Sequence, residues 1–434
     1  MKFLATASQT RSFFNQPRSP QFWPSAALLL APALATLVPS GYSVSFALLF
    51  LASLWYFKQW SLPNPLKNAA NSWPLWWVVA LLAFGLDWSV DTFLSQEGWR
   101  GLDKPSKYFL AIPCFLFALR FPPRLNWLWP GAAFGAAASG LIAIWQVFGE
   151  HSDRADGFTQ VIQFGDLSLL LGLICLIGVG LQNRHWMLPS AFLGLYASFL
   201  SGSRGGWMAL PVWVLGVMIW RYRAGLKFGP ILTGLVAGLA LMLALNQGLQ
   251  GPSLWQRIEQ AKNEVTEVTE VAQPSALAAQ TSVGQRLVHW RLAWEMILDR
   301  PLGGWGESGY QIEKAQRVSK GQVADAVLNY RHPHNEVLDI LVKRGLMGFV
   351  TLVFLFAVPI LSFWPLVKPT NDPAHRERLT LGVLGLLLPI CYVIFGFSQA
   401  YLEHNSGTVV YLTWVSLLLA RQYGQDSTEF SYMK

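Results

Sequence analysis

The sequence predicts an all-α polytopic membrane protein with about twelve transmembrane helices and one long loop that carries amphipathic helices. Of the 434 residues, 53% are hydrophobic and only 13% are charged, and 21 Trp and 27 Phe are present. A soluble domain of this length has no core large enough to bury so much apolar and aromatic surface. Apolar runs of roughly 17 to 25 residues, the length that crosses about 30 Å of hydrocarbon, recur along the chain. Segments in lipid must satisfy their own backbone hydrogen bonds, so each run is expected to be helical.

The apolar runs divide the chain into three parts. Residues 1–247 are expected to form a bundle of nine spans, 248–345 the long loop, and 346–434 three further spans and a tail. The twelve runs lie near residues 24–39, 42–57, 73–90, 106–120, 126–148, 164–181, 186–200, 204–220, 228–247, 346–366, 379–398 and 406–421. The basic N-terminus followed by an apolar run resembles a signal peptide, but further spans follow at once, so the first run is interpreted as a retained span.

The distribution of Lys and Arg predicts the orientation of the bundle. If the N-terminus is cytoplasmic, most basic residues of the short connections and tails fall on the cytoplasmic side, as the positive-inside rule requires. The short connections on the opposite side hold only Arg100, Lys104, Lys107, Arg154 and Arg204. Both termini are therefore expected in the cytoplasm, with the long loop outside.

The formal net charge of +8 does not indicate nucleic-acid binding, because the basic residues lie in short loops between apolar runs. Cys114, Cys175 and Cys391 all fall inside apolar runs. They are interpreted as small hydrophobic residues, with no disulfide framework or metal cluster.

The long loop contains a spacer and a predicted amphipathic helix. A Glu/Val/Thr repeat at residues 264–271 and the Ala/Ser/Gln-rich stretch after it are typical of a variable spacer. From Gly284 to Leu298, five apolar residues recur at helical spacing: Leu287, Trp290, Trp294, Ile297 and Leu298. This helix is expected to lie along the membrane surface.

Two arginines on the outer face are candidates for binding an anion. Arg204 lies in the turn Ser203-Arg204-Gly205-Gly206 at the start of a span, where backbone donors and a guanidinium come together. The alternative is an interfacial Arg that reaches the lipid headgroups. Arg286 lies in the first turn of the amphipathic helix, with His289 and Arg291 farther along it and Arg300 just beyond it, and the alternative is a solvated helix face.

A histidine stands where the long loop meets the next span, in the sequence His332-Pro333-His334-Asn335. Asn335 is a favourable N-cap residue, so the His334 imidazole is expected at the positive end of a helix, where a neutral ring is favoured. Such a ring can act as a general base near neutral pH, although it could also be a local cap. His332 and His334 match no strong zinc spacing, even with Glu336 or Asp339, so we expect no metal or other cofactor.

These residues resemble three motifs of the O-antigen ligase and O-antigen polymerase superfamily of membrane glycosyltransferases. The Ser203-Arg204-Gly205 turn is similar to that family's Ser-Arg-Gly motif. The stretch from Arg286 through Trp290 to Pro301-Leu302-Gly303-Gly304-Trp305-Gly306 is similar to its large-loop pattern, and His332-x-His334-Asn335 to its His-x-His-Asn block. The resemblance covers residues 200–350 well, and the first 150 residues only as a hydropathy profile.

The resemblance implies metal-independent, inverting transfer of a glycan from undecaprenyl diphosphate to an acceptor hydroxyl at the periplasmic face of the bacterial inner membrane. The acceptor is the lipid A core for a ligase and another carrier-linked glycan for a polymerase. Arg204 and Arg286 would hold the diphosphate and His334 would take the proton. Ser203, Gly205, His332, Asn335 and Arg291 are the expected substrate-binding residues, and Glu403 and His404 in the last outer turn could reach the site.

A small-anion transporter, similar to bicarbonate transporters, is an alternative from another class. A transporter should place ionisable groups within the membrane and show two matching halves. Asp87 and Asp166 are candidates for such groups, but both lie near span ends and no internal repeat is visible.

Overall fold

The computed structural model describes residues 19–61, 66, 72–223, 244, 282–368 and 375–424. These residues form helices joined by loops and short 3-10 or π turns, with no strand among them. The helices are α2 (Phe22–Leu34), α3 (Gly41–Trp55), α4 (Phe57–Ser61), α5 (Trp73–Leu94), α6 (Asp103–Arg120), α7 (Leu128–Ile144), α8 (Val161–Gln182), α9 (Leu188–Ser201), α10 (Ala209–Arg223), α13 (Ser282–Asp299), α14 (Gly306–Ser319), α15 (Glu336–Phe363), α16 (His375–Gly396) and α17 (Asn405–Tyr423).

Every predicted span except the ninth coincides with one of these helices. The ninth span, at 228–247, and the Glu/Val/Thr repeat, at 264–271, lie outside the described residues. Within the described residues, five helical segments are long and apolar enough to cross a membrane: Trp73–Leu94, Leu125–Gly149, Val161–Gln182, Glu336–Val367 and Arg376–Gly396. The chain is therefore an all-α membrane protein, as predicted.

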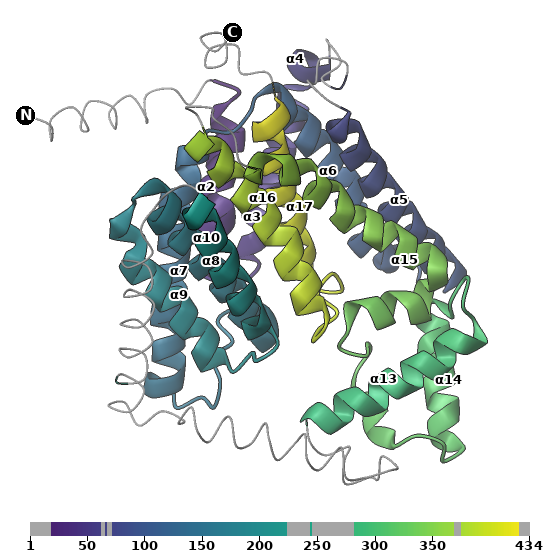
Figure 1. Cartoon of the computed structure of the whole chain (residues 1–434). Helices are drawn as coiled ribbons and strands as arrows, with labels where there is room; N and C mark the ends of the chain where they lie inside the picture. The colour runs from purple at the N-terminus through teal and green to yellow at the C-terminus, as the bar shows by residue number, and fades with distance from the viewer. Residues whose placement is uncertain are drawn as a thin grey trace, which may run out of the picture.

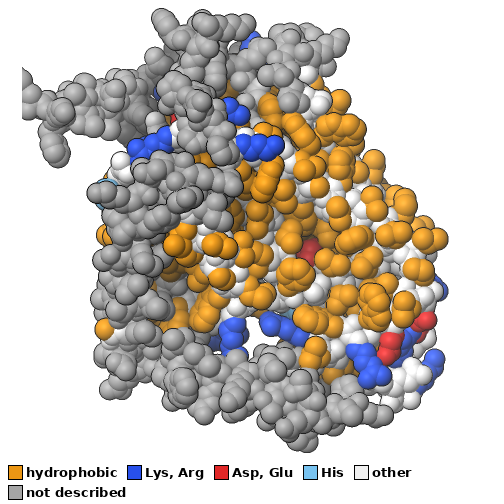
Figure 2. All heavy atoms as spheres, in the orientation of Figure 1, with side chains coloured by type: hydrophobic (Ala, Val, Ile, Leu, Met, Phe, Trp, Pro, Cys, Tyr) orange, Lys and Arg blue, Asp and Glu red, His pale blue; other side chains and the backbone are white. Residues whose placement is uncertain are grey.

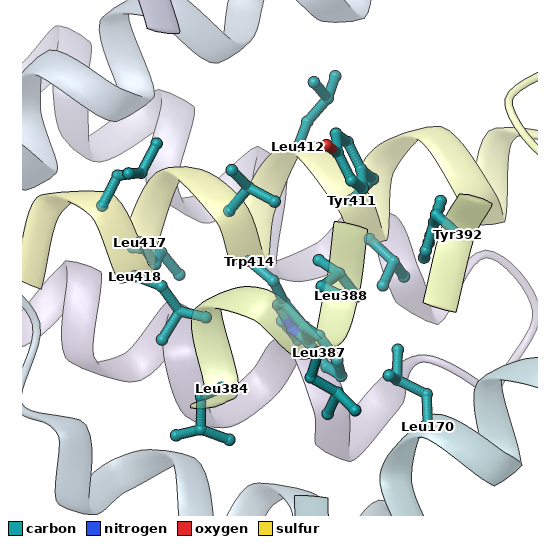
Figure 3. Close-up of a cluster of buried hydrophobic side chains, with 14 of the residues drawn as sticks. Leu170, Leu384, Leu387, Leu388, Tyr392, Tyr411, Leu412, Trp414, Leu417 and Leu418 are labelled. Atoms are coloured by element: carbon teal, nitrogen blue, oxygen red, sulfur yellow. The ribbon is translucent and has the colours of Figure 1, made fainter. Parts of the chain in front are cut away.

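The bundle packs around α8, which is buried along almost its whole length. α8 contacts α7, α9 and α16, while α15 packs on α5 and α17 packs on α6. Figure 3 shows Leu170 of α8 facing the leucine and aromatic side chains of α16 and α17. Hydrophobic side chains also gather on the face shown in Figure 2, which suits contact with lipid tails.

Two helices, α13 and α14, stand apart from the bundle at the end opposite α4 (Figure 1). They share a small core of their own with the first part of α15, built from Val288, Leu292, Met296, Tyr310 and Val342. The predicted helix is thus confirmed. Of its predicted apolar residues, Ile297 is buried in this core, whereas Leu287, Trp294 and Leu298 are exposed on a face that α14 and α15 leave uncovered.

α15 begins ten residues earlier than the predicted tenth span and is interrupted at Gly345. Gly345 has φ +62° and ψ −158°, a conformation open to glycine, so the helix breaks at the expected boundary between loop and span. The loop between α13 and α14 packs against this break. Leu346 N–H donates to the Pro301 carbonyl (2.8 Å), and Trp305 N–H donates to the Val342 carbonyl (2.9 Å). The Pro-Leu-x-Gly-x-Gly stretch therefore supplies partners for the free backbone groups of the broken helix.

Candidate active site

The loop before α15 holds His334 in an unusual backbone conformation. Asn335 caps the helix, with its side chain accepting a hydrogen bond from Leu338 N–H at 3.0 Å, as predicted. His334 has φ +54°, in the left-handed region that non-glycine residues rarely adopt. The loop is tied to α13, because the Trp290 indole donates to the Pro333 carbonyl at 2.9 Å. Strained residues of this kind persist where their surroundings fix them, often at functional sites.

The His334 ring lies in a mostly buried environment beside the connection between α16 and α17. Its Nδ1 lies 2.7 Å from Oε1 of Gln399, and its ring packs edge to face against Tyr330, with 4.7 Å between ring centroids. Burial lowers the pKa of His334 below its usual value of 6.5, the Gln399 bond opposes this, and the Arg286 charge lowers it further. The neutral imidazole was predicted from the helix end, but burial is the main cause.

Three more histidines surround this ring: His289 on α13, His332 in the same loop, and His404 before α17. The ring centroid of His332 lies 4.5 Å from that of His334 and 5.7 Å from that of His404. Burial lowers the pKa of both His289 and His404 to about 4, so both are neutral at neutral pH. In the described part of the chain, no group of three or more His, Cys, Asp or Glu residues is arranged to hold a metal ion.

The Ser203-Arg204-Gly205-Gly206 turn rests on α8 and on the α16–α17 connection. Ser203 Oγ donates to Oδ1 of Asp166 at 2.7 Å. A Cβ on Gly206 would lie 2.2 Å from the same Asp166 oxygen, and a Cβ on Gly205 would lie 2.0 Å from Oγ of Ser398. These approaches explain why glycine is needed at both positions. Asp166, a candidate carrier group under the transporter hypothesis, is thus engaged in holding this turn.

Arg154 lies within electrostatic range of two other arginines from separate segments, Arg204 and Arg286. Burial lowers the pKa of Arg154 below its usual value, and the charges of Arg204 and Arg286 lower it further. The Arg286 charge also acts on the pKa of His334, and the Arg204 turn and His334 both contact the α16–α17 connection, through Ser398 and Gln399. Arg154 was not predicted as a site residue; its Nε donates to the Ser201 carbonyl at 2.7 Å, which places it beside the Arg204 turn.

Arg291 lies elsewhere on α13. Its Nε pairs with Oε1 of Glu295 at 3.1 Å, one turn along the helix, and its side chain is 63% exposed. Residues five positions apart on a helix project in different directions, so Arg286 and Arg291 occupy different faces. Within the described residues, no hydrogen bond or ion pair links Arg291 to the histidines.

A buried ion-pair network that was not predicted from the sequence lies beside the site. Lys343 is fully buried and its Nζ lies 2.7 Å from Oδ1 of Asp339, 2.7 Å from Oε2 of Glu307 and 3.3 Å from Oε1 of Glu403. The network joins α14, α15 and the α16–α17 connection. Burial alone would raise the pKa of the Glu403 carboxyl, but the charges of Lys343 and Lys104 hold it well below its usual range.

The network continues into α5 through a second ion pair. Arg344 Nε lies 3.2 Å from Oδ2 of Asp91, and the backbone N–H of Glu307 donates to Oδ1 of the same carboxylate at 3.2 Å. Asp91 therefore fastens α14 and α15 to the bundle. One local signal was available in the sequence, since Asp339 and Lys343 have the i, i+4 spacing of a helical ion pair.

Fold and site together define an all-α membrane protein with a cationic, histidine-bearing site at one end of the bundle. The resemblance to the O-antigen ligase superfamily is confirmed, because residues 189–353 match the family model of O-antigen ligase. The match includes the Arg204 turn, α13, α14 and the His334 loop. It implies activity of the glycosyltransferase kind, as a ligase or a polymerase.

The chain is also similar to an uncharacterized protein of Haemophilus influenzae. The two are 27% identical over 390 residues, which cover 87% of this chain and 92% of the relative. The similarity therefore extends well beyond the domain matched at residues 189–353.

Proposed function

We propose that the chain is a metal-independent, inverting glycosyltransferase of the O-antigen ligase type. It moves a glycan from undecaprenyl diphosphate to the hydroxyl of a lipid A core or other glycan acceptor. The observation that carries the proposal is that His334 and the Arg204 turn contact the same α16–α17 connection, while the Arg286 charge acts on both His334 and Arg154. A base and a group of cations are the two elements that transfer from a diphosphate requires when no metal takes part.

The proposed reaction is a single displacement. His334 takes the proton from the acceptor hydroxyl, and the oxygen forms a bond to the anomeric carbon while the bond from that carbon to the diphosphate oxygen breaks. The electron pair of the broken bond leaves with the diphosphate, whose growing charge Arg204 and Arg286 stabilise. Attack opposite the leaving group inverts the anomeric centre.

Ser203, Gly205, His332, Asn335 and Arg291 remain the proposed substrate-binding residues. The first four lie in the two segments that position Arg204 and His334, whereas Arg291 occupies another face of α13 and would contact a more distant part of a substrate.

We propose the topology that places this site on the periplasmic face of the inner membrane. Twelve spans with both termini in the cytoplasm put the Arg204 turn, the long loop and the α16–α17 connection on the same outer side. The proximity of these three segments around His334 supports this arrangement, since segments on opposite sides of a membrane could not meet.

The proposal is tested by glycan transfer from the lipid-linked donor in membranes that contain the protein. We expect His334→Ala and Arg286→Ala each to reduce transfer by about two orders of magnitude or more. The matched controls are His185→Ala, beyond the C-terminal end of α8, and Arg378→Ala, in the first turn of α16; both positions are exposed, and both variants should transfer normally. Normal transfer by either site variant, at equal protein level, would contradict the assigned roles.

The product formed in cells that lack the gene separates the two activities of the family. Bare core lipid without long glycan indicates a ligase, whereas core lipid capped with a single repeat indicates a polymerase. We expect the ligase result, because the long loop that ends in His334 favours it.

A further inference from the structure

The side chain of Gln399 has four polar contacts and is fully buried in the α16–α17 connection. Its Oε1 lies 2.7 Å from Nδ1 of His334 and 3.3 Å from the backbone N–H of Ala400. Its Nε2 lies 3.2 Å from Nε2 of His404 and 3.5 Å from Oε1 of Gln160. Every polar atom of the amide group therefore has a partner.

These contacts fix which way the amide points. A backbone N–H can only donate, so the atom that faces Ala400 must be the amide oxygen. A flipped amide would direct its NH₂ group at the Ala400 donor and its oxygen at the Gln160 oxygen, losing both bonds. His404, which burial keeps neutral, can accept from the amide nitrogen in the observed orientation.

The orientation of the amide determines which nitrogen of the His334 ring carries the proton. The Gln399 oxygen cannot donate, so Nδ1 of His334 must carry the proton, and a neutral ring then has its lone pair on Nε2. We propose that Gln399 is a positioning residue that holds His334 in the tautomer with a basic Nε2. This inference rests on the proposed function for the role of His334 as the base, but the tautomer itself does not depend on it.

A neutral amide also suits the charge of this site better than a carboxylate. A carboxylate on Nδ1 would stabilise the imidazolium and leave less free base at neutral pH. An amide orients the ring with a smaller effect on its charge, so the ring stays neutral beside Arg286. The titratable or charged groups that face the ring are Arg286, His289, Tyr330, His332 and His404.

The first test measures the tautomer of the wild-type protein. The full chain is labelled with ¹⁵N-histidine in lipid nanodiscs, and the His334 signals are identified by their loss in His334→Ala. We expect the pattern of a neutral ring with a protonated Nδ1. A ring protonated at Nε2 overturns the proposal, whatever the activity of the protein.

The second test compares kinetics of glycan transfer in two variants and a control. Gln399→Leu should lower kcat by about 10- to 100-fold with KM nearly unchanged, since orientation accounts for part of the ~10²–10⁴-fold contribution of a general base. Gln399→Glu restores an acceptor for Nδ1, so it should recover activity at higher pH, with the acid limb of the pH profile shifted upward. Gln182→Leu, which removes a Gln bonded to Thr380 near the other end of α8, should match wild type.

The outcomes separate this inference from the proposed function. Wild-type kcat in Gln399→Leu, or a Gln399→Glu variant with the same pH profile as Gln399→Leu, overturns the positioning role. If the wild-type protein transfers no glycan, the proposed function fails, and the NMR measurement still decides whether Gln399 sets the tautomer.

Discussion

Replacing Lys343 by Met tests the buried ion-pair network most directly. The substitution keeps the length of the side chain and removes its charge. In the native structure the fully buried ammonium is the shared partner of Asp339, Glu307 and Glu403. In Lys343→Met these carboxylates lose that partner while they remain buried.

The expected loss follows from the cost of an uncompensated buried charge. Breaking a buried ion pair by removing one partner costs about 3 to 5 kcal/mol of the free energy of unfolding. The chain offers a matched control in Lys107 and Asp103, which have the same i, i+4 spacing and the same 2.7 Å separation. Because the Asp103 side chain is 65% exposed, Lys107→Met should cost only about 0 to 1 kcal/mol. The two variants should therefore differ by about 3 kcal/mol, or roughly two orders of magnitude in the unfolding equilibrium.

The difference is measured by denaturant unfolding of the purified protein in detergent at pH 7, followed by tryptophan fluorescence. The midpoint of Lys343→Met should fall well below those of wild type and Lys107→Met, with similar slopes. Equal midpoints for the two variants would refute the reasoning, because they would show that burial of the network adds nothing to its strength.

Three further predictions concern the site and the helix break. His334 should cause no change in the rate of glycan transfer above neutral pH, where its ring is neutral. The rate should fall as the ring is protonated, and the midpoint of this acid limb should lie below pH 6.5 because burial lowers the pKa of His334. A midpoint above 6.5 would contradict a neutral resting base. Extensive treatment with a chelator should leave the rate unchanged, and loss of activity restored by a divalent cation would refute the metal-independent mechanism. Gly345→Ala should lower the free energy of unfolding by about 1 to 3 kcal/mol, from the positive φ and from a Cβ 2.2 Å from the Leu302 carbonyl oxygen. Gly303→Ala, whose Cβ would contact nothing within 4 Å, should have little effect, and equal losses would rule out this explanation.

The helices were predictable because hydrophobic length and periodicity are local properties of the sequence. Asn335 was likewise recognised as a cap from its place before the apolar run, and the structure confirms it. The buried face of α13 was not predictable in the same way. Its helix has apolar residues on more than one side, and the choice between them depends on where α14 and α15 pack.

Part of the site was predictable because charged residues and histidines stand out between apolar runs in a chain that is only 13% charged. Arg204, Arg286 and His334 could each be identified in sequence, but their placement relative to the α16–α17 connection depends on the fold. Gln399 gave no signal, since a single glutamine between two apolar runs has no periodicity, and its partner His334 lies 65 residues away. Arg344 and Asp91 are 253 residues apart, so their pairing also required the three-dimensional structure.

The α16–α17 connection links the stability of the protein to the geometry of its site. Glu403 and His404 are neighbours in sequence, yet Glu403 pairs with Lys343 while His404 accepts from Gln399, which in turn bonds His334. A shift of this connection that broke the ion pairs would therefore also move the amide that orients the His334 ring. The buried charges thus contribute more than stability. They hold α14 and α15 on the bundle, and by fixing the α16–α17 connection they help to keep the His334 ring in the orientation proposed for the base.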